Sequence, residues 1–402
     1  MSNLPVADSD SGARKIDRGA TEVGCPVWRD EDGVWRVRGH AAGRAVLRST
    51  DTRQAGLGVE TVEKLSPKIR RPILYRDGPE HREDRRQTAR FFTPRRVGEH
   101  YRDLMVRVSE AQIAQLRRDH RAELSQLSFR LAIEVAAAVV GLTDSRPGLD
   151  RRLERFFPDE FAKPGFGSPK AIGGIFRQNF AWLAVYLGDV RPAVRARRRS
   201  RRDDLISHLI DEGCSDGEIL GECLTFAAAG MVTTREFINL AAWHLFTDDV
   251  LLTRYRSGDE PARIAVLHEL LRLEPVVGNL RRRTTGAVEV PDAGGVVTIP
   301  AGELVDIAVS VANVDPGAVG DDPLAVCPGR PLSDGTGAAG LSFGDGPHKC
   351  PGAYIAIQEA DIFLTRLFSL NGLHMVTAPR VSMKKDISGY ELRGLVVALA
   401  GA

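Results

Sequence analysis

The stretch Phe343-Gly344-Asp345-Gly346-Pro347-His348-Lys349-Cys350-Pro351-Gly352 decides how the rest of the chain is interpreted. Glycine loosens a backbone and proline removes an amide donor, so these residues predict a loop. The sequence from Ala353 to Leu370 is typical of a helix. Cys350 is therefore expected near a helix N-terminus, where a thiolate is favoured. Because no nearby Cys or His has zinc-ligand spacing, the loop indicates a metal centre other than zinc.

This loop resembles the haem-binding loop of the cytochrome P450 family, Phe-Gly-x-Gly-x-His-x-Cys-x-Gly. The six fixed positions of that pattern are met by Phe343, Gly344, Gly346, His348, Cys350 and Gly352. The resemblance implies a haem b cofactor (iron protoporphyrin IX) with Cys350 as its metal ligand. It also implies that Phe343, Gly344 and His348 belong to the cofactor-binding residues. The alternative is a glycine-rich loop with a free cysteine, and the other motifs of the chain test it.

Length and composition limit the classes of protein that the chain can belong to. Its 402 residues are 43% hydrophobic and 27% charged, with a net charge of +2, which is ordinary for a globular protein and does not favour nucleic-acid binding. Five scattered cysteines without a CxxC pair indicate a reduced, cytosolic protein. No apolar run has the length of a signal peptide or membrane span. We therefore expect a cytoplasmic monomer that contacts neither nucleic acid nor membrane.

The order of the predicted elements indicates a mainly α protein with a smaller β region (α+β). A hairpin, several amphipathic helices and a long apolar helix precede a group of strands; the clearest are predicted at 27–37, 41–48, 101–119, 122–140, 220–245, 264–273, 288–297, 298–304 and 305–311. The resemblance implies one P450 domain over residues 1–402, with haem between the long central helix and the cysteine loop with its helix. Residues 1 to about 20 are polar and are expected to be loose.

A second motif lies in Asp77-Gly78-Pro79-Glu80-His81-Arg82-Glu83-Asp84-Arg85, where a helix is expected to begin near Pro79. His81 and Arg85 are four residues apart and share a helix face. Taken alone, such a pair is usually solvated surface. The resemblance implies that both bind a haem propionate. By alignment with the family, Arg282 is the second propionate-binding arginine, and His348 completes the set.

The central helix carries a third motif, Ala229-Gly230-Met231-Val232-Thr233-Thr234, that resembles the oxygen-binding segment Ala-Gly-x-Asp/Glu-Thr-Thr. Thr233 falls on the signature threonine of the family and is the first catalytic candidate. Val232 occupies the position of the acid that usually shares proton delivery with this threonine. Glu236 lies three residues after Thr233, nearly on the same face, and is the second catalytic candidate. The alternative is that Glu236 pairs with a cation such as Arg235 or Arg281.

Glu269 and Arg272 match the Glu-x-x-Arg signature of the family, and we interpret them as a buried structural pair. The third partner that the family uses is an arginine before the cysteine loop, and Arg330 is the best candidate. Ala312-Asn313-Val314-Asp315-Pro316 and the terminal Leu392-Arg393-Gly394-Leu395 also match the family.

The resemblance implies a monooxygenase that inserts oxygen from O2 into a small, largely apolar organic substrate, in natural-product (secondary metabolite) biosynthesis. Electrons would come from ferredoxin and ferredoxin reductase, with Arg85, Arg86, Arg90 and Lys349 as the docking patch. Two alternatives remain because of Val232. One is an oxidase that forms C–C or C–O bonds by radical coupling without oxygen insertion. The other is a non-oxygenating haem protein that binds a ligand or recruits a partner. The identity of the substrate does not follow from the sequence.

Overall fold

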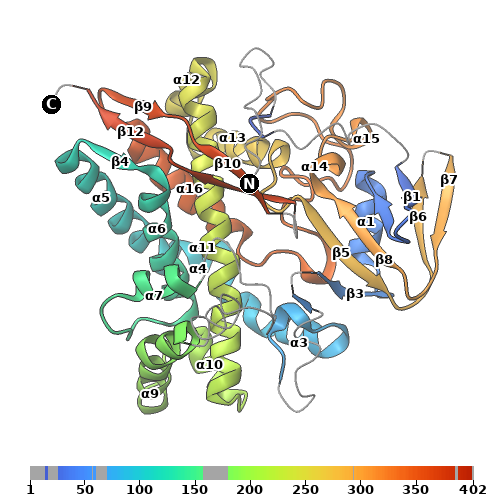
Figure 1. The fold of residues 1–402 in the computed structure, drawn as a ribbon, viewed down its shortest axis with the longest axis horizontal. Helices are drawn as coiled ribbons and strands as arrows, with labels where there is room; N and C mark the ends of the chain where they lie inside the picture. Colours follow the sequence, from blue (N-terminus) through green and yellow to red (C-terminus); the bar gives the residue numbers. More distant parts are fainter. Residues whose placement is uncertain are drawn as a thin grey trace, which may run out of the picture.

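The computed structural model describes residues 14–16, 26–56, 58–59, 70–156, 180–292, 294–384 and 388–400, and every structural statement below concerns these residues. Most helices gather on one side of the molecule, and a five-stranded sheet lies on the other (Figure 1). This arrangement confirms the predicted mainly α fold with a smaller β region.

The helical elements alternate with short turns of 3₁₀ and π helix. The α-helices are α1 (His40–Arg48), α3 (Gly78–Thr88), α4 (Pro94–Arg96), α5 (Arg102–Asp119), α6 (Leu124–Val140), α7 (Leu149–Phe156), α9 (Arg191–Arg199), α10 (Leu205–Asp211), α11 (Asp216–Thr247), α12 (Asp249–Ser257), α13 (Glu260–Leu273), α14 (Val309–Ala312), α15 (Pro316–Val319) and α16 (Ala353–Phe368). The other turns are η1 (Ile73–Tyr75), η2 (Ala89–Phe92), η3 (Val97–Tyr101), η4 (Tyr186–Val190) and η5 (Gly346–His348).

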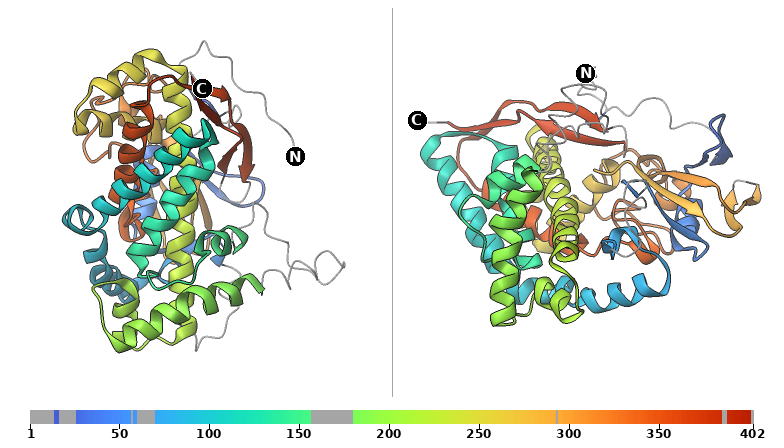
Figure 2. Two further views of the ribbon diagram at one scale, coloured as in Figure 1. Left: turned by 90° about the vertical axis from the view of Figure 1, so that its left-hand side faces the viewer. Right: turned by 60° about the horizontal axis from the view of Figure 1, so that its bottom comes forward.

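Four sheets are formed by twelve short strands in the described residues. The strands are β1 (Val27–Arg29), β2 (Trp35–Val37), β3 (Thr52–Ala55), β4 (Arg121–Glu123), β5 (Asn279–Thr284), β6 (Val288–Asp292), β7 (Gly295–Ile299), β8 (Leu304–Ala308), β9 (Leu373–Thr377), β10 (Arg380–Lys384), β11 (Gly389–Arg393) and β12 (Val396–Leu399). The largest sheet has the order β1-β2-β8-β5-β3, in which only β2 and β8 are parallel. The other sheets are β4-β12-β9, β6-β7 and β10-β11. Figure 2 shows the C-terminal strands lying along the helical part, apart from the five-stranded sheet.

The long helix α11 is the structural centre of the helical part. It begins with a capping box in which Ser215 and Glu218 satisfy each other's backbone amides. Its C-terminal half packs into one hydrophobic core with α5, α6, α13 and α16, and its N-terminal half packs into a second core with α6, α9 and α10. A third core joins α1 to the five-stranded sheet. The middle of α11 therefore lies between two cores.

Several predicted boundaries are wrong: the strand expected at 298–304, for example, is the end of β7, a turn and the first residue of β8. Two other differences share one cause. The helix expected at 122–140 begins at Leu124, because Arg121–Glu123 instead pairs with β12. The strand expected at 305–311 ends at Ala308, and the chain turns into α14 because the Val309 amide donates to Gly278 O and no longer to a neighbouring strand. In both cases a distant segment supplies the hydrogen-bond partner, which local periodicity does not reveal.

The expectation that residues 1 to about 20 are loose is wrong for Arg14–Ile16, and the rest of that stretch lies outside the described residues. Ile16 is fully buried in the core of α5, α11 and α16. The backbone amides of Lys15 and Ile16 donate to Glu274 Oε1, the latter over 3.2 Å. Arg14 Nε donates to Leu273 O over 2.9 Å. These three residues form an N-terminal anchor, in which two backbone amides donate to one oxygen of the buried Glu274 carboxylate.

Removing this anchor should destabilise the fold. We expect deletion of residues 1–16 to lower the free energy of unfolding by about 2–4 kcal/mol, because an Ile leaves the core and a buried carboxylate loses two donors. Urea unfolding followed by circular dichroism measures the change. Deletion of residues 1–13, which keeps the three anchor residues, is the reference against which this change is measured. Equal midpoints for both deletions would contradict a stabilising role for the anchor.

Candidate functional site

The backbone of the cysteine loop is shaped by glycines and by its contact with α1. Gly344 and Gly346 have φ angles of 67° and 65°, a region that favours glycine. A Cβ at Gly346 would lie 2.2 Å from Leu47 O, so the loop approaches α1 more closely than a side chain permits. Asp345 accepts hydrogen bonds from Arg44 Nε at 3.1 Å and Arg48 Nε at 2.8 Å. These contacts hold the loop on α1.

Cys350 lies at the end of this loop, just before α16. Its amide donates to Phe343 O over 2.8 Å, which closes the loop. The side chain reaches solvent, yet enough protein surrounds it that burial raises the pKa of the thiol. The Gly352 amide and Arg85 act in the opposite direction and do not outweigh burial. The expected thiolate at a helix N-terminus is therefore corrected: in the protein alone the thiol is favoured, and a bound metal has to displace its proton.

The cations predicted to bind the cofactor come together from three elements. The rings of His81 on α3 and His348 in the loop are stacked, with centroids 4.1 Å apart. His348 Nε2 lies 2.8 Å from Asp77 Oδ1; since a carboxylate only accepts, this nitrogen is the donor. Arg85 donates to Lys349 O, beside Cys350. The fourth cation, Arg282, lies on β5.

Asp77, which binds His348, is the one described carboxylate within hydrogen-bond or ion-pair distance of this cluster. Burial and the nearby His348 and Arg85 lower the pKa of His81 to about 4, and its Nδ1 is buried without a hydrogen-bond partner among the described residues. Arg282 is 3% exposed, and burial lowers its pKa to about 10. Its Nη1 donates to Arg281 O, and no described carboxylate lies within ion-pair distance of it. A buried arginine without an anion is costly. The donors of this cluster fit the two propionates of a haem beside Cys350.

The middle of α11 is unusually small and open. Ala229 and Gly230 are exposed although most of the helix is buried. A Cβ at Gly230 would meet only Ala136 Cβ, at 4.0 Å, so no described protein atom crowds the glycine. No described part of the chain closely approaches this face, and a flat cofactor fits the space. Thr233 Oγ1 donates to Ala229 O over 2.6 Å, so its hydroxyl is bonded to the preceding turn of the helix.

Glu236, the second catalytic candidate, is 1% exposed, and donors occupy both of its oxygens. Oε1 accepts from Arg235 Nε at 2.8 Å and from Arg393 Nη1 at 2.7 Å. Oε2 accepts from the Leu392 amide at 2.7 Å. The alternative in which Glu236 pairs with Arg235 is thus confirmed, and Arg393 joins them. The arrangement favours a structural role, in which Glu236 fixes β11 against α11, over proton transfer.

The predicted Glu-x-x-Arg pair is buried and has the expected third partner. Arg272 Nε and Nη2 lie 2.8 and 2.7 Å from the two oxygens of Glu269, and Arg330 Nε lies 3.1 Å from Glu269 Oε1. Asn313 connects this pair to the cysteine loop. Its Nδ2 donates to Arg272 O over 3.0 Å, and its Oδ1 accepts from the Leu341 amide over 2.6 Å.

Sequence reasoning missed three residues that position the site: Asp77, Asn313 and Asp345. Each occurs inside a motif that the sequence analysis quoted, but only as part of a pattern. A usable signal existed for Asp345, because Arg44 and Arg48 are spaced i, i+4 on a predicted helix and need an anion. Among the described residues no group of three His, Cys, Asp or Glu side chains could hold a metal ion, so Cys350 is a candidate single protein ligand. The described helices include none that is long and apolar enough to cross a membrane.

Comparisons with a family profile, with known sequences and with solved structures all indicate the same protein family. The profile of the family described as Cytochrome P450 matches residues 263–387. Erythromycin C-12 hydroxylase of Saccharopolyspora erythraea is 31% identical over 364 residues, which cover 86% of this chain and 84% of that protein. Cytochrome P450 monooxygenase PikC of Streptomyces venezuelae is 29% identical, over 84% of this chain and 77% of that protein. The solved structure of a P450 EryK mutant in complex with erythromycin B has a TM-score of 0.73 at 27% identity, covering 94% of this chain and 93% of that chain.

The close contact between the cysteine loop and α1 predicts the effect of a side chain at position 346. Gly346→Ala combines a positive φ with a clash against Leu47 O, so we expect it to displace the loop and reduce cofactor incorporation at least tenfold, as measured by haem absorbance per protein. Gly337→Ala is the control, because its φ is not positive and its nearest neighbour would be Gly340 O at 3.6 Å. Normal haem content in Gly346→Ala would show that this contact does not shape the site.

Proposed function

The chain belongs to the cytochrome P450 family, and from this premise we propose that it is a haem b monooxygenase that inserts one oxygen atom of O2 into a small, largely apolar natural product. P450 monooxygenase activity and a haem cofactor come with the family. The observation that carries the proposed site is the buried Arg282, which has no ion-pair partner among the described residues, together with the His81–His348 stack. It supports two propionates on one side of Cys350.

The residues of the chain have separable tasks in this proposal. When bound, haem ligated by a cysteine thiolate supplies the activation of dioxygen. Cys350 is the proposed ligand, and the Gly352 amide stabilises negative charge on its sulfur. His81, Arg85, Arg282 and His348 orient the propionates, with Phe343 and Gly344 forming the loop. Thr233, on the open middle of α11, is proposed to hold and pass a proton toward the dioxygen substrate.

We propose ferredoxin and ferredoxin reductase as the electron donors, because P450s of this kind take electrons from separate redox partners. The docking patch is smaller than the sequence suggested. Arg85 is half-buried and donates to Lys349 O, and Arg86 forms a 2.6 Å ion pair with Glu83. Arg90 and Lys349 are exposed without a described ion-pair partner and remain the best candidates for contact with an acidic ferredoxin.

The named substrates of the relatives differ, so we propose only a class of substrate. One relative is named for hydroxylation of erythromycin, and another, 28% identical, is Nocardicin C N-oxygenase of Nocardia uniformis. Both are natural products. We propose Ala229, Val232 and Thr233 on α11 as residues that contact the substrate; they are small or mostly apolar, which supports a largely apolar scaffold.

A carbon-monoxide spectrum tests ligation and electron supply together. Protein reduced with dithionite under carbon monoxide should give the red-shifted Soret band of a thiolate-ligated haem, and reduction by ferredoxin, ferredoxin reductase and NADPH should give the same band. Cys350→Ser should lose the band, whereas Cys327→Ser, which changes another exposed thiol, should keep it. Absence of the band from folded wild-type protein would refute haem-thiolate ligation. A band with dithionite alone would refute only the ferredoxin proposal.

The radical-coupling alternative stands because Val232 cannot take part in proton delivery as the usual acid does. We expect Val232→Asp to raise oxygen insertion per NADPH several-fold, since a positioned acid commonly contributes about 10²–10⁴ in rate. The assay uses ¹⁸O2 and the compound that gives the largest absorption shift in a natural-product panel. Val232→Asn is the matched control without an ionisable group. Equal yields from the Val, Asn and Asp forms would contradict a role for the missing acid. A product free of ¹⁸O in all forms would favour coupling.

A further inference from the structure

Gln54 is a buried polar residue that the proposed site leaves without a role. It lies on β3 and is 5% exposed. Its Oε1 is buried without a hydrogen-bond partner among the described residues, and its Nε2 donates to none of them. Burying a polar group that makes no hydrogen bond is costly, so buried side-chain amides are almost always paired. The unpaired amide of Gln54 therefore points to a ligand.

The pairing of β3 with β5 places Gln54 directly opposite Arg282 (Figure 1). Residues that are directly opposed in an antiparallel pair project from the same face of the sheet, with Cβ atoms about 4.5–5.5 Å apart. The side chains of Gln54 and Arg282 are thus neighbours on one face, and both are buried. Arg282 Nη1 donates to Arg281 O, which leaves its other N–H groups for an anion.

A carboxylate connects Gln54 to the cysteine loop. The backbone amide of Gln54 donates to Asp77 Oδ2 over 3.0 Å, and Asp77 Oδ1 accepts from His348 Nε2 at 2.8 Å. Asp77 also acts on Arg282: burial lowers the pKa of Arg282 to about 10, and the charge of Asp77 opposes this shift. Gln54, Arg282 and His348 therefore converge on one part of the cofactor site.

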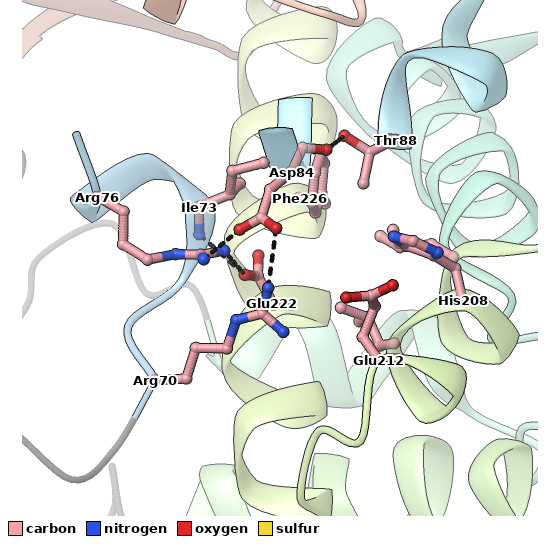
Figure 3. A pocket seen from close by; sticks show the side chains of 11 residues that line it. Arg70, Ile73, Arg76, Asp84, Thr88, His208, Glu212, Glu222 and Phe226 are labelled. Atoms are coloured by element: carbon pink, nitrogen blue, oxygen red, sulfur yellow. Dashed lines mark hydrogen bonds and ion pairs between the residues drawn. The ribbon is translucent and has the colours of Figure 1, made fainter. Parts of the chain in front are cut away.

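Asp77 is held in place without the side chain of Gln54. Arg76, the residue before it, lines a polar pocket between α3, α10 and α11 (Figure 3). The Arg76 guanidinium pairs with Asp84 of α3 and, at 3.2 Å, with Glu222 of α11. These ion pairs fix the backbone that leads into Asp77. The side-chain amide of Gln54 is therefore available to a ligand.

The neighbouring groups select the chemistry of that ligand. Arg282 and His348, which are proposed to bind propionates, are hydrogen-bond donors, and a side-chain amide can add a donor of its own. The Asp77 carboxylate already accepts from His348 and from the backbone of Gln54. A carboxylate of the cofactor fits beside these donors, because a buried anion is stable only when its oxygens are satisfied.

We propose that the side-chain amide of Gln54 donates a hydrogen bond to the same haem propionate as Arg282. Gln54 is then a further cofactor-binding residue of this chain. This role deepens the proposed function and rests on it, because the acceptor is the haem. Residue 54 lies outside the motifs quoted from the sequence, and its place in the site follows from the register of β3 on β5.

Resonance Raman spectroscopy of the haem-loaded protein tests the hydrogen bond, because the bending mode of the propionates responds to hydrogen bonds at their oxygens. Gln54→Met keeps the length of the side chain and removes the amide. We expect it to shift this mode to lower frequency and to speed haem transfer to apomyoglobin about tenfold, since a hydrogen bond to a charged group is lost. Gln54→Lys keeps a donor and is expected to retain the wild-type mode.

Gln112→Met is the matched control. Gln112 on α5 is also a buried glutamine whose Oε1 has no described partner, but α5 carries none of the proposed cofactor-binding residues. This variant is expected to keep the wild-type mode and transfer rate. Gln54→Asn keeps an amide but shortens its reach, so it should shift the mode as Gln54→Met does, and it replaces Gln54→Met if that variant does not fold.

The outcomes separate this hydrogen bond from the proposed function. An unchanged mode and transfer rate in haem-loaded Gln54→Met would overturn the hydrogen bond and leave the proposed function intact. Equal shifts in Gln54→Met and Gln54→Lys, or the same shift in Gln112→Met, would assign the effect to packing and also overturn it. Absence of haem from folded wild-type protein would overturn the proposed function and the role of Gln54 with it.

Discussion

The rest of the structure depends on one buried carboxylate, that of Glu269. Its Oε1 accepts from Arg272, from Arg330 and from the Cys327 amide, so α13 is fixed to the segment that leads into the cysteine loop. A buried ion pair of this kind is stable only when each charge is compensated. Arg272 also donates to Asn313 O, and Asn313 holds the Leu341 amide just before the loop. One electrostatic network thereby sets the position from which Cys350 is presented.

The centre of the molecule follows a different constraint. α11 contributes to two hydrophobic cores, one along each half, and Ala229 and Gly230 near its middle belong to neither. Rigid packing at both ends lets the small residues Ala229 and Gly230 stay exposed without loosening the helix. The fold thus holds a small, exposed surface at Ala229 and Gly230, and the nearby Val232 departs from the usual pattern of the family.

Local sequence patterns predicted the elements whose partners are close in the chain or belong to a dense motif. The cysteine loop, the His81–Arg85 face and the Glu269–Arg272 pair are of this kind, whereas Arg330, 61 residues from Glu269, was assigned from the resemblance to the family. The failures involve partners that no local pattern encodes. Glu236 was predicted to take part in proton delivery, but Arg393, 157 residues away in the sequence, pairs with it. The stretch around Ile16 was predicted to be loose, but the Ile16 amide donates to Glu274. Burial of Cys350, which raises the pKa of its thiol, likewise follows from tertiary packing alone.

The sheet β4-β12-β9 has a consequence for how the protein is made. Its middle strand, β12, lies at residues 396–399, whereas its partner β4 lies at residues 121–123, just before α6. Since ribosomes add about 5–20 residues per second, β4 waits on the order of 15–55 s for the strand that pairs with it. During translation the strand β4, just before α6, therefore has no strand to pair with. The sheet β4-β12-β9 therefore forms only at the end of synthesis, and until then chaperones can bind the nascent chain.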